Sequence, residues 1–299
     1  LKKADNALHR AKDDGRSHYR FFEQSMHDSL LQKLAMESRL RASILTKETF
    51  QMHYQPQLDL KTGRVVGMEA LMRWHCPEQG NVSPLQFIPI AEETGIITEL
   101  GDWGLQTACK FCRRMHDAGY SNLSVSVNVS VKQLAQENYV ESVAAALVEA
   151  GLQPAALELE ITESTLINAF ESKVKKLNAL RSMGIRTALD DFGTGYSSLT
   201  YLQQLPIHTL KIDQAFVNRM STEESTRMII ESIISLAHRL GISVVAEGIE
   251  SKEQRDLLQQ YDCDLIQGYL IGPPLSSSQM TAWLAAHQLS GEPHTNTER

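Results

Sequence analysis

Residues 156–191 read ALELEITESTLINAFESKVKKLNALRSMGIRTALDD, and this stretch decides the fold. It begins with a short β-rich run, Ala156–Ile161, and ends with another, Ile185–Leu189, with helical sequence between them. Two short strands that flank a helix of about 10 to 15 residues indicate a βαβ unit, in which the strands run parallel. The stretch therefore predicts a parallel sheet with helices packed against it.

The same alternation continues in both directions along the chain. We expect strands at Gln51–Leu60, Val65–Trp74, Leu123–Ser130, Ala156–Ile161, Ile185–Leu189, Thr209–Ile212, Ser243–Ala246 and Leu265–Tyr269. Eight such strands favour closure into a (β/α)8 barrel, which commonly occupies about 250 residues as one domain. The alternative is an open doubly wound sheet, but no G-x-G-x-x-G motif follows a first strand.

The first two predicted strands are joined by only four residues, Lys61–Arg64. Parallel strands need a crossover of about a dozen residues or more, so these two strands are expected to pair antiparallel. The predicted fold is thus an α/β, TIM-like barrel with an antiparallel first strand, over residues 46–286.

The segments outside the predicted barrel differ from it in composition. Residues 1–26 hold one helical stretch and a short β-rich run, which is too little to fold alone. Residues 27–45 place leucines at helical spacing among charged residues, as an amphipathic linker does. Residues 287–299 are polar and lack an apolar period, which predicts a mobile tail.

Composition excludes several classes of protein. The net charge of −7 disfavours a broad basic surface for duplex nucleic acid. No run of about 18 uncharged apolar residues is present, and residues 1–5 lack the apolar core that a secretory signal has. The four cysteines form no disulfide framework, and Cys109 and Cys112 are predicted to be ordinary thiols, because an isolated C-x-x-C is half of a zinc site at best. We therefore expect a soluble, cytoplasmic chain, while an upstream membrane anchor in a longer parent protein stays open.

Each predicted strand leads into a polar or charged residue near its C-terminal end. These residues are Glu69, Asn128, Glu160 with Glu163, Asp190 with Asp191, Lys211, Glu247 and Gln267. The C-terminal ends of all strands of a barrel converge on one face, where active sites lie. We therefore expect one cluster of these side chains, although a single acid at a strand end is more often a helix N-cap or a solvated loop residue.

A cluster of this composition predicts a metal site. Carboxylates in a half-buried cluster repel one another and lose hydration, so a positive group must lie among them. One lysine cannot neutralise five acids, whereas divalent cations can, and carboxylate and amide oxygens suit Mg²⁺ or Mn²⁺. Adjacent Asp190 and Asp191 can share the site only where the strand ends and the chain turns, which Gly193 and Gly195 permit.

Other polar residues have two interpretations each. Lys211, in an apolar strand, either serves the site or forms a structural salt bridge. Arg73 offers a fork-shaped donor to a phosphate or forms a surface ion pair. Gln55 and Gln267 either bond to neighbouring backbone or contact a ligand. The sequence shows no histidine pattern for zinc hydrolysis, no G-x-S-x-G elbow and no G-x-x-x-x-G-K-[ST] loop.

These residues occur in a series of motifs that resembles the EAL-domain cyclic di-GMP phosphodiesterases. In order, the motifs are Tyr54-Gln55-Pro56, Glu69-Ala70-Leu71 with Arg73-Trp74, Phe87-Ile88-Pro89, Asn128-Val129-Ser130, Glu160-Ile161-Thr162-Glu163, Asp190-Asp191-Phe192-Gly193, Leu210-Lys211-Ile212-Asp213, Ala246-Glu247-Gly248-Ile249-Glu250 and Gln267-Gly268-Tyr269. The sequence departs from the family at Gln57, where an aliphatic residue is commoner, and at Cys76, where a His is frequent. Residues 1–26 look like the C-terminal end of a GGDEF domain.

The resemblance implies a role for each residue. It assigns a first metal ion to Glu69, Asn128, Glu160 and Asp190, and a second to Asp190, Asp191 and Glu247. It assigns catalysis to Lys211, which would orient the attacking water, together with Glu69 and Glu247. It assigns substrate contacts to Gln55, Leu71, Arg73, Gln267 and Pro274. Glu163 would stabilise the loop that begins at Asp191.

The implied activity is hydrolysis of cyclic di-GMP to linear pGpG by a water activated between two Mg²⁺ or Mn²⁺ ions, with Ca²⁺ expected to inhibit. Family members often pair through the segment after the fifth strand, about residues 193–205 here, which predicts a homodimer. Upstream GGDEF and sensor domains are expected in the parent protein. Two alternatives are a degenerate domain that binds cyclic di-GMP without cleaving it, and an enolase-like, Mg²⁺-dependent barrel. The complete ligand set disfavours the first, and the motif series disfavours the second.

Overall fold

The computed structural model describes residues 24–163, 165, 169–193 and 199–288. Two compact units share the chain. The first contains the residues up to Phe50 and Trp74–Ile97, and the second contains Gln51–Arg73 and the residues from Thr98 onward. The proposed GGDEF remnant and the tail lie almost entirely outside the described residues, so the predicted domain boundaries stay predictions.

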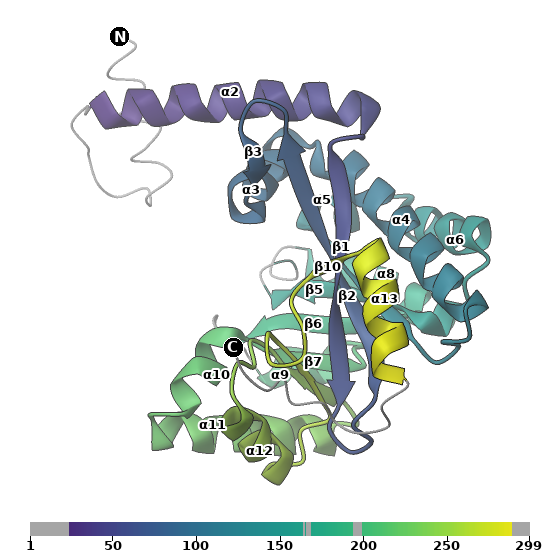
Figure 1. The fold of residues 1–299 in the computed structure, drawn as a ribbon, viewed down its shortest axis with the longest axis vertical. Helices are drawn as coiled ribbons and strands as arrows, with labels where there is room; N and C mark the ends of the chain where they lie inside the picture. The colour runs from purple at the N-terminus through teal and green to yellow at the C-terminus, as the bar shows by residue number, and fades with distance from the viewer. Residues whose placement is uncertain (1–23, 164, 166–168, 194–198, 289–299) are drawn as a thin grey trace. The chain divides into compact units, whose positions relative to one another are not determined.

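Eight strands form a closed barrel, part of which is seen in Figure 1. They are β1 (Phe50–Asp59), β2 (Val65–Cys76), β4 (Ser124–Asn128), β5 (Leu157–Thr162), β6 (Arg186–Phe192), β7 (Thr209–Ile212), β8 (Ser243–Ala246) and β9 (Leu265–Gln267). The order is β1-β9-β8-β7-β6-β5-β4-β2, and β1 pairs with β2 to close the barrel. Neighbours from β2 to β9 run parallel, whereas β1 runs antiparallel to β9. The predicted barrel with an antiparallel first strand is confirmed.

The turn between β1 and β2 explains the antiparallel start. The Asp59 carboxylate accepts hydrogen bonds from the Thr62 backbone N–H (2.7 Å) and hydroxyl (3.0 Å). The Asp59 N–H donates to the Arg64 carbonyl (2.9 Å) across the turn. Gly63 has a φ of 67°, a left-handed conformation that glycine adopts without a Cβ clash. The chain therefore folds back on itself within the five residues between β1 and β2, which leaves no room for a crossover.

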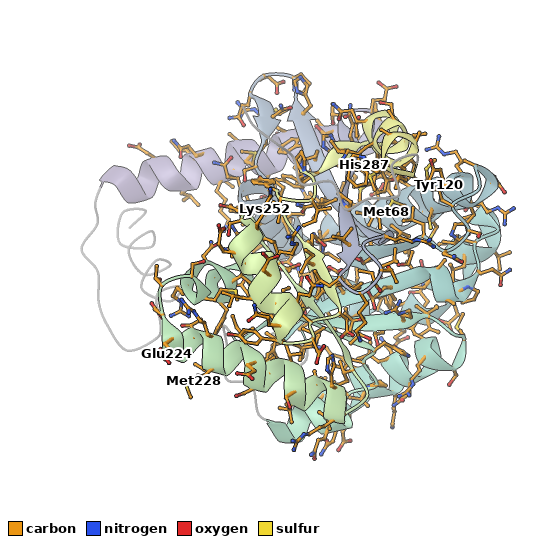
Figure 2. All side chains as sticks on the ribbon, turned by 60° about the horizontal axis from the view of Figure 1, so that its bottom comes forward. Met68, Tyr120, Glu224, Met228, Lys252 and His287 are labelled. Carbon is orange, nitrogen blue, oxygen red and sulfur yellow. The ribbon has the colours of Figure 1, made fainter. Side chains whose placement is uncertain are left out.

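Helices of the second unit pack around the barrel strands. They are α4 (Ile97–Asp117), α5 (Val131–Ala135), α6 (Tyr139–Ala150), α8 (Phe170–Ser182), α9 (Leu199–Gln204), α10 (Gln214–Met220), α11 (Glu224–Arg239), α12 (Lys252–Gln260) and α13 (Ser277–Gln288). Figure 2 shows Glu224 and Met228 on the outer side of α11, where Met228 is 63% exposed. Strand residues facing the helices are apolar, so Leu157 and Leu159 of β5 share one core with Leu177 of α8.

The interior of the barrel is polar in contrast. Side chains alternate along a strand, so the residues between the apolar ones face the other way. On β5 these are Glu158 and Glu160, both buried. Glu158 accepts a hydrogen bond from the hydroxyl of Thr209 on β7 (2.6 Å) and lies 3.4 Å from the guanidinium of Arg186 on β6. Partners for buried charge are thus supplied from neighbouring strands.

The first unit is built around Trp74. It contains α2 (Gln24–Thr46), β3 (Gly80–Val82) and α3 (Pro84–Thr94), and β3 pairs antiparallel with the end of β2. The Trp74 indole N–H donates to the hydroxyl of Ser43 on α2 (3.2 Å), and its ring packs against Phe50 and Phe87 with centroids 5.9 and 5.6 Å apart. The predicted linker is therefore helical. Two short strands, β3 and β10 (Leu275–Ser276), were not predicted.

The four cysteines are free and buried. Burial raises the pKa of Cys109 and of Cys112 to about 12, so both are neutral thiols at pH 7. The structure thus agrees with the prediction of ordinary thiols. Within the described part of the chain, no helix combines the length and the apolar character needed to cross a membrane.

Candidate active site

Most of the polar residues predicted at the strand ends converge at one mouth of the barrel. The site is a cavity of about 270 Å³. It is lined by Gln55, Glu69, Leu71, Asp190, Lys211, Asp213, Gln214, Glu247, Gly248, Glu250, Gln267, Gly268, Tyr269 and Pro274. These residues come from β1, β2, β6, β7 and β9 and from the segments that follow β7, β8 and β9. The barrel therefore assembles one site from residues more than 200 positions apart, such as Gln55 and Gln267.

Lys211 lies at the centre of the carboxyl groups. Its Nζ is 2.6 Å from an oxygen of Glu160, 2.7 Å from Glu247, 3.2 Å from Asp190 and 3.6 Å from Glu69. The side chain of Lys211 is 1% exposed, so water contributes almost nothing to its solvation. Four carboxyl groups thus surround one buried ammonium group, and the acids exceed the bases.

This excess of acid shifts the pKa values of the cluster. Burial raises the pKa of Glu160 well above its usual value, and the neighbouring Glu69 adds to the effect. Burial also raises the pKa of Glu247 to about 8. For Glu69, burial is outweighed by Lys211 and by hydrogen bonds from two amides, which lower its pKa. Burial alone would lower the pKa of Lys211, but the carboxylates outweigh it and raise the pKa well above its usual value. The cluster is therefore short of positive charge.

Asp190 and Asp191 lie at the end of β6, where the backbone turns. The pairing of β6 with β7 shifts register between Leu189 and Phe192, and Asp191 has a φ of 57°. This left-handed conformation costs a non-glycine residue about 1–3 kcal/mol, and such strain is concentrated at functional sites. The Asp191 N–H donates to Asp190 Oδ1 (2.9 Å), and burial, followed by the charge of Asp190, raises the pKa of Asp191. Of the predicted turn, residues 194 and 195 lie outside the described residues.

Two amide side chains bond to Glu69, and a third bonds to one of these two. Asn128 Nδ2 donates to Glu69 Oε1 (2.7 Å), and Gln267 Nε2 donates to Glu69 Oε2 (2.6 Å). Gln267 Nε2 also donates to Gln55 Oε1 (3.1 Å), while Gln55 Nε2 donates to the Gly272 carbonyl (3.1 Å). Gln55 therefore bonds both to the backbone at Gly272 and to the side chain of Gln267. Each carboxylate oxygen of Glu69 accepts a hydrogen bond from one amide, which fixes the orientation of the carboxylate.

The donor set fits a hard divalent cation. Glu160 Oε1 is buried and has no hydrogen-bond partner among the residues described. A buried acceptor of this kind normally has a donor or an ion beside it. Within the described ranges, no three Asp, Glu, His or Cys side chains converge as ligands on one point, and Lys211 Nζ lies between the carboxylates instead. A cation bound among these carboxylates would share them with the Lys211 ammonium group.

Comparison with known proteins places this barrel in a family. The EAL domain matches residues 37–274 of the chain. The chain belongs to the EAL domain family.

Two relatives of this EAL domain come from Pseudomonas aeruginosa. The bifunctional diguanylate cyclase/cyclic di-GMP phosphodiesterase MucR is 39% identical over 282 residues, which cover 94% of this chain and 41% of MucR. The cyclic di-GMP phosphodiesterase NbdA is 40% identical over 293 residues, which cover 98% of this chain and 37% of NbdA. The chain thus spans about two fifths of the length of these relatives.

A solved structure of the PaMucR phosphodiesterase in complex with c-di-GMP superposes on this EAL domain. The TM-score is 0.79 and the identity 38%, and the match covers 82% of this chain and 99% of that one. The fold of the neighbour therefore corresponds to the barrel described above over nearly its whole length.

Some predicted residues of the EAL domain lie away from the lining of the cavity. Leu71 and Pro274 line it, whereas Arg73 does not. Arg73 Nη1 donates to the Met72 carbonyl (2.9 Å), burial lowers the pKa of Arg73, and it forms no ion pair with any described carboxylate. The surface ion pair considered for Arg73 is thus not seen in the described part of the chain. Glu163 is partly exposed just past the end of β5.

Some lining residues had no predicted role. They are Asp213, Gln214, Gly248, Glu250, Gly268 and Tyr269. Each follows β7, β8 or β9 within a few residues, so the strand-end rule would have found them if it had been extended past the first polar residue. Gly248 has a φ of 69°, and a Cβ there would lie 2.2 Å from Gln214 Cγ. Glycine at this position lets the two segments approach at the rim.

A larger hollow lies within the first unit, among α2, β3 and α3. Its volume is about 680 Å³, and Arg39 is the one ionisable side chain in its lining. Size alone would favour this hollow as the active site. Because its lining holds no carboxylate and only one ionisable side chain, we assign the chemistry to the barrel mouth.

Proposed function

We propose that this EAL domain hydrolyses cyclic di-GMP to linear pGpG with the help of two divalent ions, Mg²⁺ or Mn²⁺. The observation that carries the proposal is the set of four carboxyl groups around Lys211, with one Glu160 oxygen that has no hydrogen-bond partner among the described residues. Phosphodiesterases of this family are metal-dependent in general. The substrate is supported by the relatives MucR and NbdA, which are both named as cyclic di-GMP phosphodiesterases. This chain matches about two fifths of the length of each.

The ligands in this proposal fall into two sets. Glu69, Asn128, Glu160 and Asp190 hold one ion, and Asp190, Asp191 and Glu247 hold the other. When bound, two such cations neutralise charge on the phosphoryl oxygens and make a shared water more acidic. Asp190 belongs to both sets because it lies at the bulged end of β6 beside Asp191.

The protein side chains then position the reactants. Lys211 donates a hydrogen bond that orients the attacking water. The water oxygen forms a bond to phosphorus, the bond from phosphorus to the 3′-oxygen breaks, and a proton passes to that oxygen. The substrate is held by Gln55, Leu71, Arg73, Gln267 and Pro274, and Glu163 stabilises the segment that starts at Asp191.

Hydrolysis of cyclic di-GMP by the purified chain tests the proposal. We expect pGpG, separated by chromatography, with Mg²⁺ or Mn²⁺ and none with excess chelator. Glu69→Ala should reduce turnover by about 100-fold or more, since it removes a ligand. Glu149→Ala is the control, because this exposed acid pairs only with Lys110 among the described partners. Tight binding without cleavage at any metal concentration would favour the receptor alternative instead.

The proposed assembly extends beyond the barrel. The homodimer would form through residues 193–205, of which 194–198 lie outside the described residues, and GGDEF and sensor domains would precede the barrel in a longer protein. Light scattering on the active chain tests the dimer. A monomer with full activity would contradict it.

A further inference from the structure

We propose that Gln57 is a positioning residue, which sets the orientation of the Gln267 amide and thereby holds Glu69 ready for a metal ion. This inference rests on the proposed function, because it concerns the same site. Gln57 lies inside the barrel on β1 and is 3% exposed. It does not line the cavity, and no role was assigned to it by the motif series.

A continuous chain of side-chain hydrogen bonds links Gln57 to Glu69. Gln57 Nε2 donates to Gln267 Oε1 (2.9 Å) and lies 3.4 Å from the hydroxyl of Ser126. Gln267 Nε2 in turn donates to Glu69 Oε2 (2.6 Å) and to Gln55 Oε1 (3.1 Å). Gln57, Gln267, Ser126 and Glu69 are all at most 5% exposed, so bulk water has little access to these bonds.

The chemistry of the groups decides which of them donates and which accepts in each of these hydrogen bonds. A carboxylate only accepts hydrogen bonds, so Gln267 must present its NH₂ group to Glu69. Gln267 Oε1 must then face Gln57, which has to present an NH₂ group of its own. A rotated Gln267 amide would place its oxygen against the Glu69 carboxylate. Gln57 therefore selects the one amide orientation of Gln267 that supports Glu69.

Gly67 on β2 provides the space that Gln57 needs. A Cβ built on Gly67 would lie 2.5 Å from Gln57 Oε1, closer than any real contact. The φ of Gly67 is not in the left-handed region, so its backbone would accept an alanine. The absence of a side chain at residue 67 is thus explained by the Gln57 amide. A substitution at Gly67 can therefore displace Gln57 without altering it.

Two variants and one control test the proposal. Gln57→Met keeps the length of the side chain and removes both polar atoms, and Gly67→Ala pushes the intact amide away. Ser124→Ala is the control. Ser124 pairs with Gly67 across the strands. Its hydroxyl donates to the Val66 carbonyl and is not part of the hydrogen bonds that link Gln57 to Glu69. For each protein we would measure the dissociation constant of Mn²⁺ alone by calorimetry, then kcat, KM and the thermal midpoint.

We expect both test variants to bind Mn²⁺ about tenfold more weakly than the wild type. Mutation of residues that hydrogen-bond to a metal ligand typically lowers metal affinity by roughly 10–100-fold, and this estimate takes the low end. Saturating Mn²⁺ should restore kcat to within about threefold, because the reacting groups are untouched. Ser124→Ala should bind Mn²⁺ as the wild type does. Unchanged Mn²⁺ binding in both test variants would overturn the inference. A wild type that binds Mn²⁺ but does not hydrolyse cyclic di-GMP would refute the proposed function. The Mn²⁺ dissociation constants of the variants would still test the role of Gln57.

Discussion

Replacement of Lys211 by Met removes the one ammonium group from the centre of the cluster. The side chain keeps a similar length, so the barrel interior loses little volume. Lys211 Nζ lies 2.6 Å from Glu160 and 2.7 Å from Glu247, and its side chain is 1% exposed. After the change, the four carboxyl groups face one another without a counter-charge.

The structure sets the expected magnitude. Removal of one partner from a buried ion pair typically costs about 3–5 kcal/mol, because the other charge is left buried and unpaired. Lys110→Met is the matched control, since Lys110 Nζ is also 2.6 Å from a carboxylate oxygen, that of Glu149, but both side chains are about half exposed. Exposed pairs contribute about 1 kcal/mol or less. The two variants thus share chemistry and distance and differ in burial.

Urea unfolding in excess chelator, followed by fluorescence, measures the stability, and chromatography of pGpG measures the activity. We expect Lys211→Met to lose about 3–5 kcal/mol of unfolding free energy. Its turnover should fall by about 10²–10⁴-fold, as for loss of a group that handles the attacking water. Mn²⁺ at about 100 times its dissociation constant should return about 2.7 kcal/mol by binding to the folded state. Equal unfolding midpoints for Lys211→Met and Lys110→Met in chelator would refute this account of the buried cluster.

Two further predictions concern the backbone at the rim and the response to pH. Gly268→Ala should lower the unfolding free energy by about 1–3 kcal/mol or more and reduce turnover, because a Cβ would lie 2.2 Å from the backbone N and O of Ile249; urea unfolding that matches the wild type would contradict the close approach. Burial, followed by the charges of Arg181 and Arg186, lowers the pKa of His208, whose Nδ1 accepts from the Thr187 N–H (3.1 Å). The unfolded chain therefore binds more protons, and stability should fall as the pH drops below about 6.5. We would measure the unfolding free energy of the wild type, His208→Asn and His75→Asn by urea titration at pH 7.5 and 5.5. His208→Asn should lose less stability between these pH values than the wild type, whereas the control His75→Asn, at an exposed position, should match the wild type. An equal loss of stability in all three proteins would argue against His208.

Much of the barrel followed from local patterns. The strands at Thr209–Ile212 and Ser243–Ala246 were predicted with the bounds that the structure shows, because short apolar runs between helical stretches are a local signal. β3 and β10 were missed, since three and two residues are too few to show an alternation. The strand at residue 265 ends at Gln267 rather than Tyr269, because the tight segment at Gly268 packs directly against Ile249.

The composition of the site could be predicted for a related reason. A parallel barrel carries all its strand ends to one face, so polar residues at those ends must meet there. This rule found Glu69, Glu160, Asp190, Lys211 and Glu247 before any contact was known. It did not find Asp213 or Glu250, which lie on the segments beyond the strands. The path of the backbone after a strand depends on the residues that it packs against. The local sequence does not contain this information.

The sequence by itself determined the α/β barrel, its antiparallel start and the set of acids, amides and one lysine at its mouth. The tertiary structure alone decided how these groups share their hydrogen bonds. It set Lys211 between four carboxyl groups, gave Asp191 its left-handed backbone and linked Gln57 through Gln267 to Glu69. Periodicity and strand ends depend on neighbours along the chain, whereas these contacts join residues up to 210 positions apart and depend on strand register.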